Sequence, residues 1–228
     1  MKTSSELRAD ARYVLGGSIF EQPWLLAVVV CLIYSAINGA VNTFFSGFDN
    51  TFSRSSELTT VIISGYASIA ISLVASTLLL IPLDMGVKSY FLKLVRGKQP
   101  NIGDTFNGLR YDYGKNVLLG LMSTLIVGLW SLLFIIPGII KAYSFAMSYY
   151  IKSDHPDYDW RDCLSESERM MKGNRWRLFC LQLSFIGWMI VGSLCLGVGT
   201  LWVSAYQSTA VALFYEELKE KDQLYAQL

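Results

Sequence analysis

The longest stretch of this chain without Asp, Glu, Lys or Arg runs from Leu178 to Tyr215 and contains 38 residues. Four shorter uncharged stretches occupy Gln22–Phe48, Leu58–Leu83, Asn116–Ile140 and Ala142–Ile151. A helix needs about 20 predominantly apolar residues to cross the hydrocarbon core of a bilayer. The longest stretch therefore has room for two crossings, and we expect an all-α, polytopic transmembrane protein.

The composition also fits a membrane protein better than a soluble one. Hydrophobic residues make up 53% of the chain and charged residues 16%, against about 25% charged residues in a typical soluble domain. The net charge of +1 gives no basic excess of the kind that binds nucleic acid. The 228 residues include no Pro-, Gly- or Ser-rich linker, so a single membrane domain is expected.

Residues 1–20 predict an amphipathic helix that precedes the membrane domain. Thr3 and Glu6 have the spacing of a capping box, in which each side chain accepts a hydrogen bond from a free backbone N–H. Arg8 and Arg12 lie opposite the apolar residues, which recur at helical spacing. We expect this helix to lie flat at the membrane surface, with both arginines near anionic headgroups.

The remaining residues, 21–228, predict a transmembrane helical bundle of six spans. The spans are expected at about 24–45, 59–83, 116–136, 139–151, 178–196 and 201–215. Two polar segments, 84–115 and 152–177, separate them and contain amphipathic helices that we expect at the membrane interface. Pro137-Gly138 is expected to end the third span, and Gly197-Val198-Gly199 to separate the last two.

The fourth segment, Ile139–Ile151, is short for a crossing. At about 1.5 Å per residue it covers about 20 Å of a core of about 30 Å, so it either crosses with help from Lys141 and Lys152 or is re-entrant. Crossing places 17 of the 19 Lys and Arg residues on one side, with Arg54 and Lys141 on the other. The positive-inside bias favours this arrangement and places both termini in the cytoplasm.

The spans carry polar residues but no ionisable side chain near a span centre, where such groups mark proton or ion pathways. This pattern disfavours a proton-coupled transporter. Small residues at every fourth position allow close helix packing, although a serine-lined conduit is the alternative. The candidates for helix packing or for a conduit are Ser64, Ser68, Ser72, Ser76, Asn38, Asn42 and Gln207.

The loop after the fourth span places three aspartates around His155, the only histidine. A divalent cation site is conceivable from these residue types. The better interpretation is that Pro156 ends one helix and Asp159 caps the next, with Asp162 three residues further on. No catalytic motif accompanies the loop, so we expect no enzyme activity, no metal and no cofactor.

Several short motifs resemble an uncharacterised family of bacterial integral-membrane proteins, domain of unknown function 975. The motifs are Leu7–Arg12, Ile136–Lys141, Ser165-Glu166-Ser167, Met171-Lys172-Gly173, Trp176–Phe179, Leu183–Trp188, Gly197-Val198-Gly199 and Phe214-Tyr215-Glu216. The resemblance implies a multi-pass protein of the bacterial cytoplasmic membrane. It also implies a distant similarity to the membrane region attached to some glycerophosphodiester phosphodiesterases, and it supplies no catalytic residues.

We therefore expect a non-enzymatic membrane protein that interacts with lipids, above all anionic phospholipids, or with a membrane-protein partner, in a role such as envelope homeostasis. Lys172, Arg175 and Arg177 join Arg8 and Arg12 as candidate headgroup ligands. The alternative is a transporter or channel for a small amphipathic solute. A membrane-bound phosphodiesterase is a third hypothesis.

Overall fold

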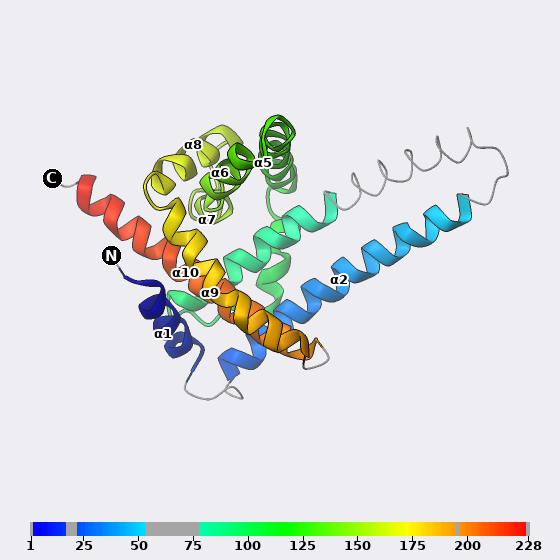
Figure 1. Ribbon diagram of the computed structural model, residues 1–228, viewed down its shortest axis with the longest axis horizontal. Coiled ribbons are helices and arrows are strands. Elements are labelled where there is room, and N and C mark those ends of the chain that lie inside the picture. Colours follow the sequence, from blue (N-terminus) through cyan, green and yellow to red (C-terminus); the bar gives the residue numbers. More distant parts are fainter. Residues whose placement is uncertain (1, 17–21, 53–77, 195–196, 227–228) are drawn as a thin grey trace.

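The computed structural model describes residues 2–16, 22–194 without 53–77, and 197–226, and these residues form helices without any strand (Figure 1). The N- and C-terminal ends lie near each other on one side of the molecule (Figure 1). The all-helical class predicted from the sequence is confirmed for this part of the chain.

The first helix, α1 (Ser4–Leu15), begins with the predicted capping box. Thr3 Oγ1 accepts a hydrogen bond from the Glu6 backbone N–H, and the Glu6 carboxylate accepts one from the Thr3 backbone N–H. The apolar face of α1 is buried against two later helices, α9 and α10. Protein therefore covers the face that a surface helix would turn toward the bilayer.

The next helix, α2 (Gln22–Phe52), starts one residue before Pro23 and includes the first predicted span, 24–45. The second predicted span, 59–83, lies mostly outside the described residues. From residue 78 the chain is one helix through residue 95, and this helix passes through Pro82 without a break. It ends at Gly97, whose positive φ of 68° suits a residue without a Cβ atom.

A short connection packs closely on the helix 78–95. It consists of the 3₁₀ helix η1 (Ile102–Phe106) and the helix α4 (Asn107–Arg110). A Cβ atom on Gly86 would lie 1.7 Å from the Thr105 carbonyl oxygen, and one on Gly108 would lie 2.0 Å from the Pro82 carbonyl oxygen. Glycine is therefore required at both crossing points.

The helices α5 (Tyr113–Leu133) and α6 (Ile135–Ser144) form a tight pair joined by a single residue. The joint is Phe134, which has an extended backbone. The prediction that Pro137-Gly138 ends this span is wrong, because Pro137 lies in the first turn of α6. A proline is tolerated there since the first N–H groups of a helix have no partner within it.

The predicted fourth span, 139–151, is not one helix. After α6 the chain turns through residues 145–147 and continues as α7 (Ser148–Asp154). The helix α8 (Trp160–Met171) follows, with the predicted capping box between Asp159 and Asp162. Its apolar side packs on α5, α6 and α7, so protein rather than lipid covers that side of the helix.

The last two helices, α9 (Arg175–Leu194) and α10 (Val198–Ala226), form an antiparallel hairpin (Figure 1). Gly197, with φ of 77°, lies at the turn, which confirms the predicted break. Gly192 and Gly199 approach each other beside the turn. The charged tail of the chain continues α10 without interruption.

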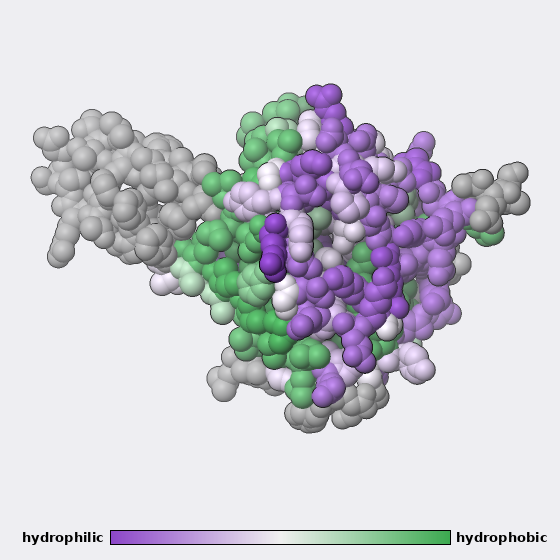
Figure 2. Space-filling view, turned by 180° about the vertical axis from the view of Figure 1, so that it is seen from behind, coloured by the Kyte–Doolittle hydropathy of each residue, from purple (hydrophilic) through white to green (hydrophobic). Residues whose placement is uncertain are grey.

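Three helices of the described chain are long and apolar enough to cross a membrane, namely Gln22–Val41 of α2, α5 and α9. Figure 2 shows hydrophobic and hydrophilic side chains gathered on different sides of the surface. This separation is expected of a membrane protein with one polar end.

Candidate functional site

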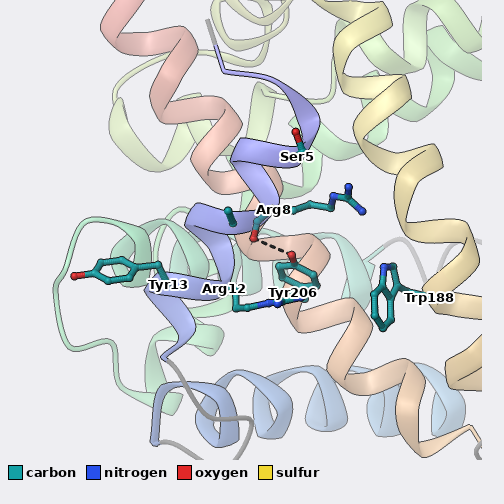
Figure 3. A pocket seen from close by; sticks show the side chains of 7 residues that line it. Ser5, Arg8, Arg12, Tyr13, Trp188 and Tyr206 are labelled. Atoms are coloured by element: carbon teal, nitrogen blue, oxygen red, sulfur yellow. Dashed lines mark hydrogen bonds between the residues drawn. The ribbon is translucent and has the colours of Figure 1, made fainter.

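An open groove of about 610 Å³ lies between α1 and α9, with α10 beside it. From α1 it is lined by Ser5, Arg8, Arg12 and their neighbours Ala9 and Tyr13; α9 contributes Trp188 and α10 contributes Tyr206. Figure 3 shows Arg8 and Arg12 extending from α1 toward the side of Trp188, whereas Tyr13 points away. The groove therefore has a cationic wall and an aromatic wall.

The position of α1 follows from its residue pattern. Leu7, Ala11 and Leu15 are buried, so helical periodicity turns Arg8 and Arg12 away from this packed face. The Tyr206 hydroxyl donates a hydrogen bond of 2.8 Å to the Arg8 backbone oxygen, which ties α1 to α10.

The C-terminal end of α1 is tied down separately. Trp24 Nε1 donates a hydrogen bond of 3.3 Å to the Gly16 backbone oxygen, and the Trp24 ring lies 6.0 Å from the Tyr206 ring. The arginines thus project from a helix that is held at both ends, because the capping box fixes its N-terminus.

The two arginines of the groove have unused hydrogen-bonding capacity. Among the described residues, neither Arg8 nor Arg12 forms a salt bridge with a carboxylate, and Arg8 Nε is buried without a hydrogen-bond partner. A guanidinium group favours planar anions such as carboxylate or phosphate, which it binds through two parallel N–H groups. The groove can therefore hold an anion.

The opposite wall is suited to an apolar group. The Trp188 side chain is 50% exposed, and the Tyr206 ring packs edge-on against Phe185 at 5.0 Å. Further along α9, Ile190 and Val191 are also exposed. An anion with an attached hydrocarbon chain would match both walls, since amphipathic rings such as that of tryptophan favour the membrane–water interface.

One part of the chain, which includes α6 to α9 and most of α10, matches a known protein family. Residues 132–222 match the model of a family described as Protein of unknown function (DUF975). This region is therefore similar to the DUF975 family. No curated protein and no solved structure matches the chain, so the similarity to glycerophosphodiester phosphodiesterases is not shown.

The matched region, residues 132–222, contains the aromatic wall of the groove but not the cationic one. Trp188 and Tyr206 lie inside the match, whereas Arg8 and Arg12 on α1 lie outside it. The resemblance noted for the motif Leu7–Arg12 therefore stays a prediction. The groove therefore lies between α9 and α10, which contribute residues inside the match, and α1, which lies outside it.

The other three predicted headgroup ligands lie elsewhere, at the junction of α8 and α9. Arg177 Nη2 is 3.0 Å from Glu217 Oε1 and donates a 2.6 Å hydrogen bond to the Lys2 backbone oxygen. Arg175 Nη2 is 3.7 Å from Glu168 Oε1, and Lys172 is exposed. Arg177 is thus engaged within the protein, and the structure does not bring these three residues to the groove.

The predicted conduit residues are mostly beyond the described part of the chain. Ser64, Ser68, Ser72 and Ser76 lie in the segment 53–77, and the Asn42 side chain is not described either. Asn38 on α2 and Gln207 on α10 are both half-buried. The conduit therefore stays a prediction.

The loop around His155 has a structural arrangement. The His155 ring stacks on Tyr158 at 4.6 Å, and the described residues contain no group of three or more His, Cys, Asp and Glu side chains that could hold a metal ion. Asp159 caps α8, as predicted.

A network of charges that could not be predicted from the sequence is centred on Asp154, whose side chain is only 7% exposed. Both carboxylate oxygens accept 2.7 Å hydrogen bonds from Arg96, and Oδ2 also accepts one of 2.6 Å from Lys219. Tyr215 donates a further one at 3.0 Å. Arg96 also binds Glu216, so the network joins the helix 78–95, α7 and α10.

The electrostatics of Asp154 follow from these partners. Burial alone would raise the pKa of the carboxyl group, but the hydrogen bonds and charges of Arg96 and Lys219 outweigh it and lower the pKa to about 2. The network is therefore fully charged at neutral pH. The one indication in the sequence was the charge bias, which places residues 96, 154 and 219 on the same side of the membrane.

Proposed function

We propose that this chain is a non-enzymatic, multi-pass protein of the bacterial cytoplasmic membrane that binds anionic phospholipid in the groove between α1 and α9. The observation that carries this proposal is the pair Arg8 and Arg12, which lack a carboxylate partner among the described residues and lie across an open groove from the half-exposed Trp188. A role in envelope homeostasis is compatible with such binding.

The chemistry of the two walls supports a lipid in particular. A phosphate group would accept hydrogen bonds from the guanidinium groups of Arg8 and Arg12. The attached acyl chain would run over the exposed apolar face of α9, where Ile190 and Val191 lie. Trp188 would then lie at the boundary between headgroup and hydrocarbon, the level at which tryptophan is enriched.

The charged residues support an orientation in which this polar end faces the cytoplasm. Lys2, Arg96, Arg177 and Lys219 all form ion pairs or hydrogen bonds in the charged region around Asp154 and Glu217. The positive-inside bias assigns such a region to the cytoplasmic side, which places both termini there.

Native mass spectrometry can test the groove, using protein gently extracted into mixed phosphatidylglycerol and phosphatidylcholine. We expect the wild-type protein to retain phosphatidylglycerol and the double variant Arg8→Gln/Arg12→Gln to lose it. The matched control is Lys98→Gln/Arg110→Gln, which removes two exposed positive charges elsewhere and should retain the lipid. Equal retention by both double variants, or equal loss, would contradict the assignment.

A further inference from the structure

We propose that the α5–α6 hairpin does not cross the bilayer but inserts its tip into the leaflet nearest the charged end of the protein. The surface concerned consists of residues 125–140, and its partner is the acyl chains of that leaflet. This proposal is independent of the groove between α1 and α9.

Lys141 lies in the last turn of α6. Its Nζ atom lies 2.7 Å from Glu168 Oε1 on α8. The next residue of α8, Arg169, lies 2.5 Å from Asp222 in the charged end of α10. This end of α10 also carries Glu217, which pairs with Arg177. Lys141 therefore lies on the same side of the membrane as the charged tail.

This contact corrects the six-span topology predicted from the sequence. That topology places Lys141 on the side opposite to segment 152–177, which contains Glu168. Two atoms in an ion pair cannot be separated by a bilayer core of about 30 Å. The count of Lys and Arg residues on each side was misleading because it treats Lys141 as an isolated positive charge. In the structure the carboxylate of Glu168 neutralises that charge.

The α5–α6 hairpin extends only a short distance beyond Lys141. The joint at Phe134 precedes Lys141 by seven residues of the sequence, which corresponds to about 10 Å along a helix. The core measures about 30 Å. With Lys141 at the headgroups, the tip cannot reach the opposite surface.

The hairpin α9–α10 provides an internal comparison. Arg177 and Leu194 are separated by 17 residues of α9, or about 25 Å. This distance is close to the thickness of the whole core. The two hairpins therefore differ in depth, although α5 and α9 have similar lengths and both qualify as candidate spans by composition.

The length of α5 does not oppose a shallow position, because its first turn carries the exposed Lys115 and one side of its first half is packed against protein. Asn116 is buried and donates hydrogen bonds of 2.9 Å to the backbone oxygens of Gly108 and Tyr111. Gly120 lies directly against the Ile81 side chain. The second half of α5, in which Leu125 is 56% and Leu129 is 69% exposed, therefore presents the larger apolar surface to lipid.

The tip of the hairpin consists of exposed apolar side chains. Leu132 is 86% exposed and Ile135 is 75% exposed, and the neighbouring residues 133, 134 and 136 are similarly exposed. No Asp, Glu, Lys or Arg interrupts Asn116–Ile140. Residues this apolar on both sides of a turn match hydrocarbon. The ion pairs of Lys141 and Arg175 with Glu168 place charge at the base of the tip, at headgroup level.

If α8 lay inside the membrane, the Lys141–Glu168 contact would also allow the α5–α6 hairpin to cross fully, but the charged side of α8 excludes this position. Arg161, Asp162 and Arg169 of α8 are not buried. Charged side chains facing hydrocarbon are costly. The polar side of α8 therefore fixes the level of α6 at the interface.

Depth-dependent fluorescence quenching tests this inference directly. An environment-sensitive fluorophore is attached to Phe134→Cys, or in a second sample to Leu194→Cys, in a variant without the native cysteines. The protein is reconstituted in vesicles of phosphatidylcholine and phosphatidylglycerol. A label at Lys98→Cys marks the charged side. Nitroxides near the top or the end of the acyl chain report depth, and dithionite added outside reports aqueous exposure.

We expect the label at position 134 to be quenched most by nitroxides in the leaflet on the Lys98 side and to be protected from dithionite on both sides. The label at position 194 should instead be quenched from the opposite leaflet. Exposure of position 134 to dithionite on the side opposite to Lys98 would overturn the proposal, as would exposure on the same side.

A second arrangement keeps the test decisive if the cysteine-free variant does not fold. The label is then attached to Ile136→Cys in the native background, and the unmodified protein is treated in parallel to subtract any labelling of native thiols. Cys31 and Cys163 are buried and Cys180 is half-buried, so the unmodified sample accounts for labelling of the remaining native thiols. The same protection pattern supports the shallow tip, and exposure on the side opposite to Lys98 overturns it.

Discussion

Gly192 and Gly199 face each other across the α9–α10 hairpin, so closely that a Cβ atom on Gly192 would lie 2.9 Å from the Gly199 carbonyl carbon. The obstacle is backbone, which cannot rotate aside as a flexible side chain could. The two helices therefore meet at this point only because both residues are glycine, as in other close helix pairs in membranes.

Gly192→Ala should consequently destabilise the hairpin by about 1–3 kcal/mol, the usual cost of overpacking. The matched control is Gly187→Ala on the same helix, where an added Cβ would meet nothing within 4 Å. Alanine at position 187 should be neutral or slightly stabilising because of its higher helix propensity. Thermal unfolding in detergent measures both, and equal melting temperatures would refute the close packing.

Gly138→Ala should loosen the α5–α6 pair in a similar way. An added Cβ would lie 2.7 Å from the Ser131 α-carbon, so the backbone of α6 would have to move. Gly128→Ala on α5 is the control, since its Cβ would have free space. Thermal unfolding in detergent should show a lower melting temperature for the first variant only, and equal values would contradict the close packing.

Asp154→Asn should destabilise the protein by about 3 kcal/mol, because it leaves the positive charges of Arg96 and Lys219 without their shared carboxylate. Asp157→Asn, in the exposed loop after α7, removes the same charge and should have little effect. Chemical unfolding monitored by circular dichroism compares the two. A similar loss in both variants would show that the net charge, not the network, is responsible.

The network should also fail in acid over a defined pH range. The pKa of Asp154 is lowered from its ordinary value of 3.8 to about 2, so its contribution to stability is complete above about pH 4 and lost as the pH falls through about 2. The difference in melting temperature between the wild type and Asp154→Asn should therefore be constant from neutral pH to pH 4 and shrink below it. A difference that already shrinks near pH 6 would contradict the assignment.

Thr3→Ala should weaken the first turn of α1 by about 1 kcal/mol, because the capping hydrogen bond to the Glu6 N–H is lost. Thr3→Asp keeps a capping oxygen and should behave like the wild type. Hydrogen exchange of the α1 amides distinguishes the two. Faster exchange in both variants would mean that contacts other than the cap hold this end.

Local features of the fold could be predicted from the sequence because neighbouring residues determine them. The capping boxes at Thr3 and Asp159 are examples, as is the turn at Gly197. The boundary at Pro137 was misplaced because proline both ends helices and suits their first turn. Hydropathy cannot distinguish these two roles without the preceding residue, Phe134, whose extended backbone makes the break.

Contacts between distant segments could not be predicted. Arg8 and Arg12 were identified as candidate ligands from one helix, but Trp188 and Tyr206 reach them only through the packing of α1 on α10. The pairing of Lys141 with Glu168 is hidden for the same reason. A charge count treats each side chain as solvated and independent, and the fold overrides that assumption.

The charged end of the protein also implies an order of assembly. The Lys2 backbone N–H donates to Glu217 across 215 positions of sequence, and Arg96 binds Glu216 across 120. Neither carboxylate exists until translation has passed residues 216 and 217. The earlier helices therefore enter the membrane before these contacts can form. The contacts form only when the last turns of α10 have been synthesised. A chain that stops short of residue 216 should be recognisable to proteases as unfinished, even with every apolar helix already made.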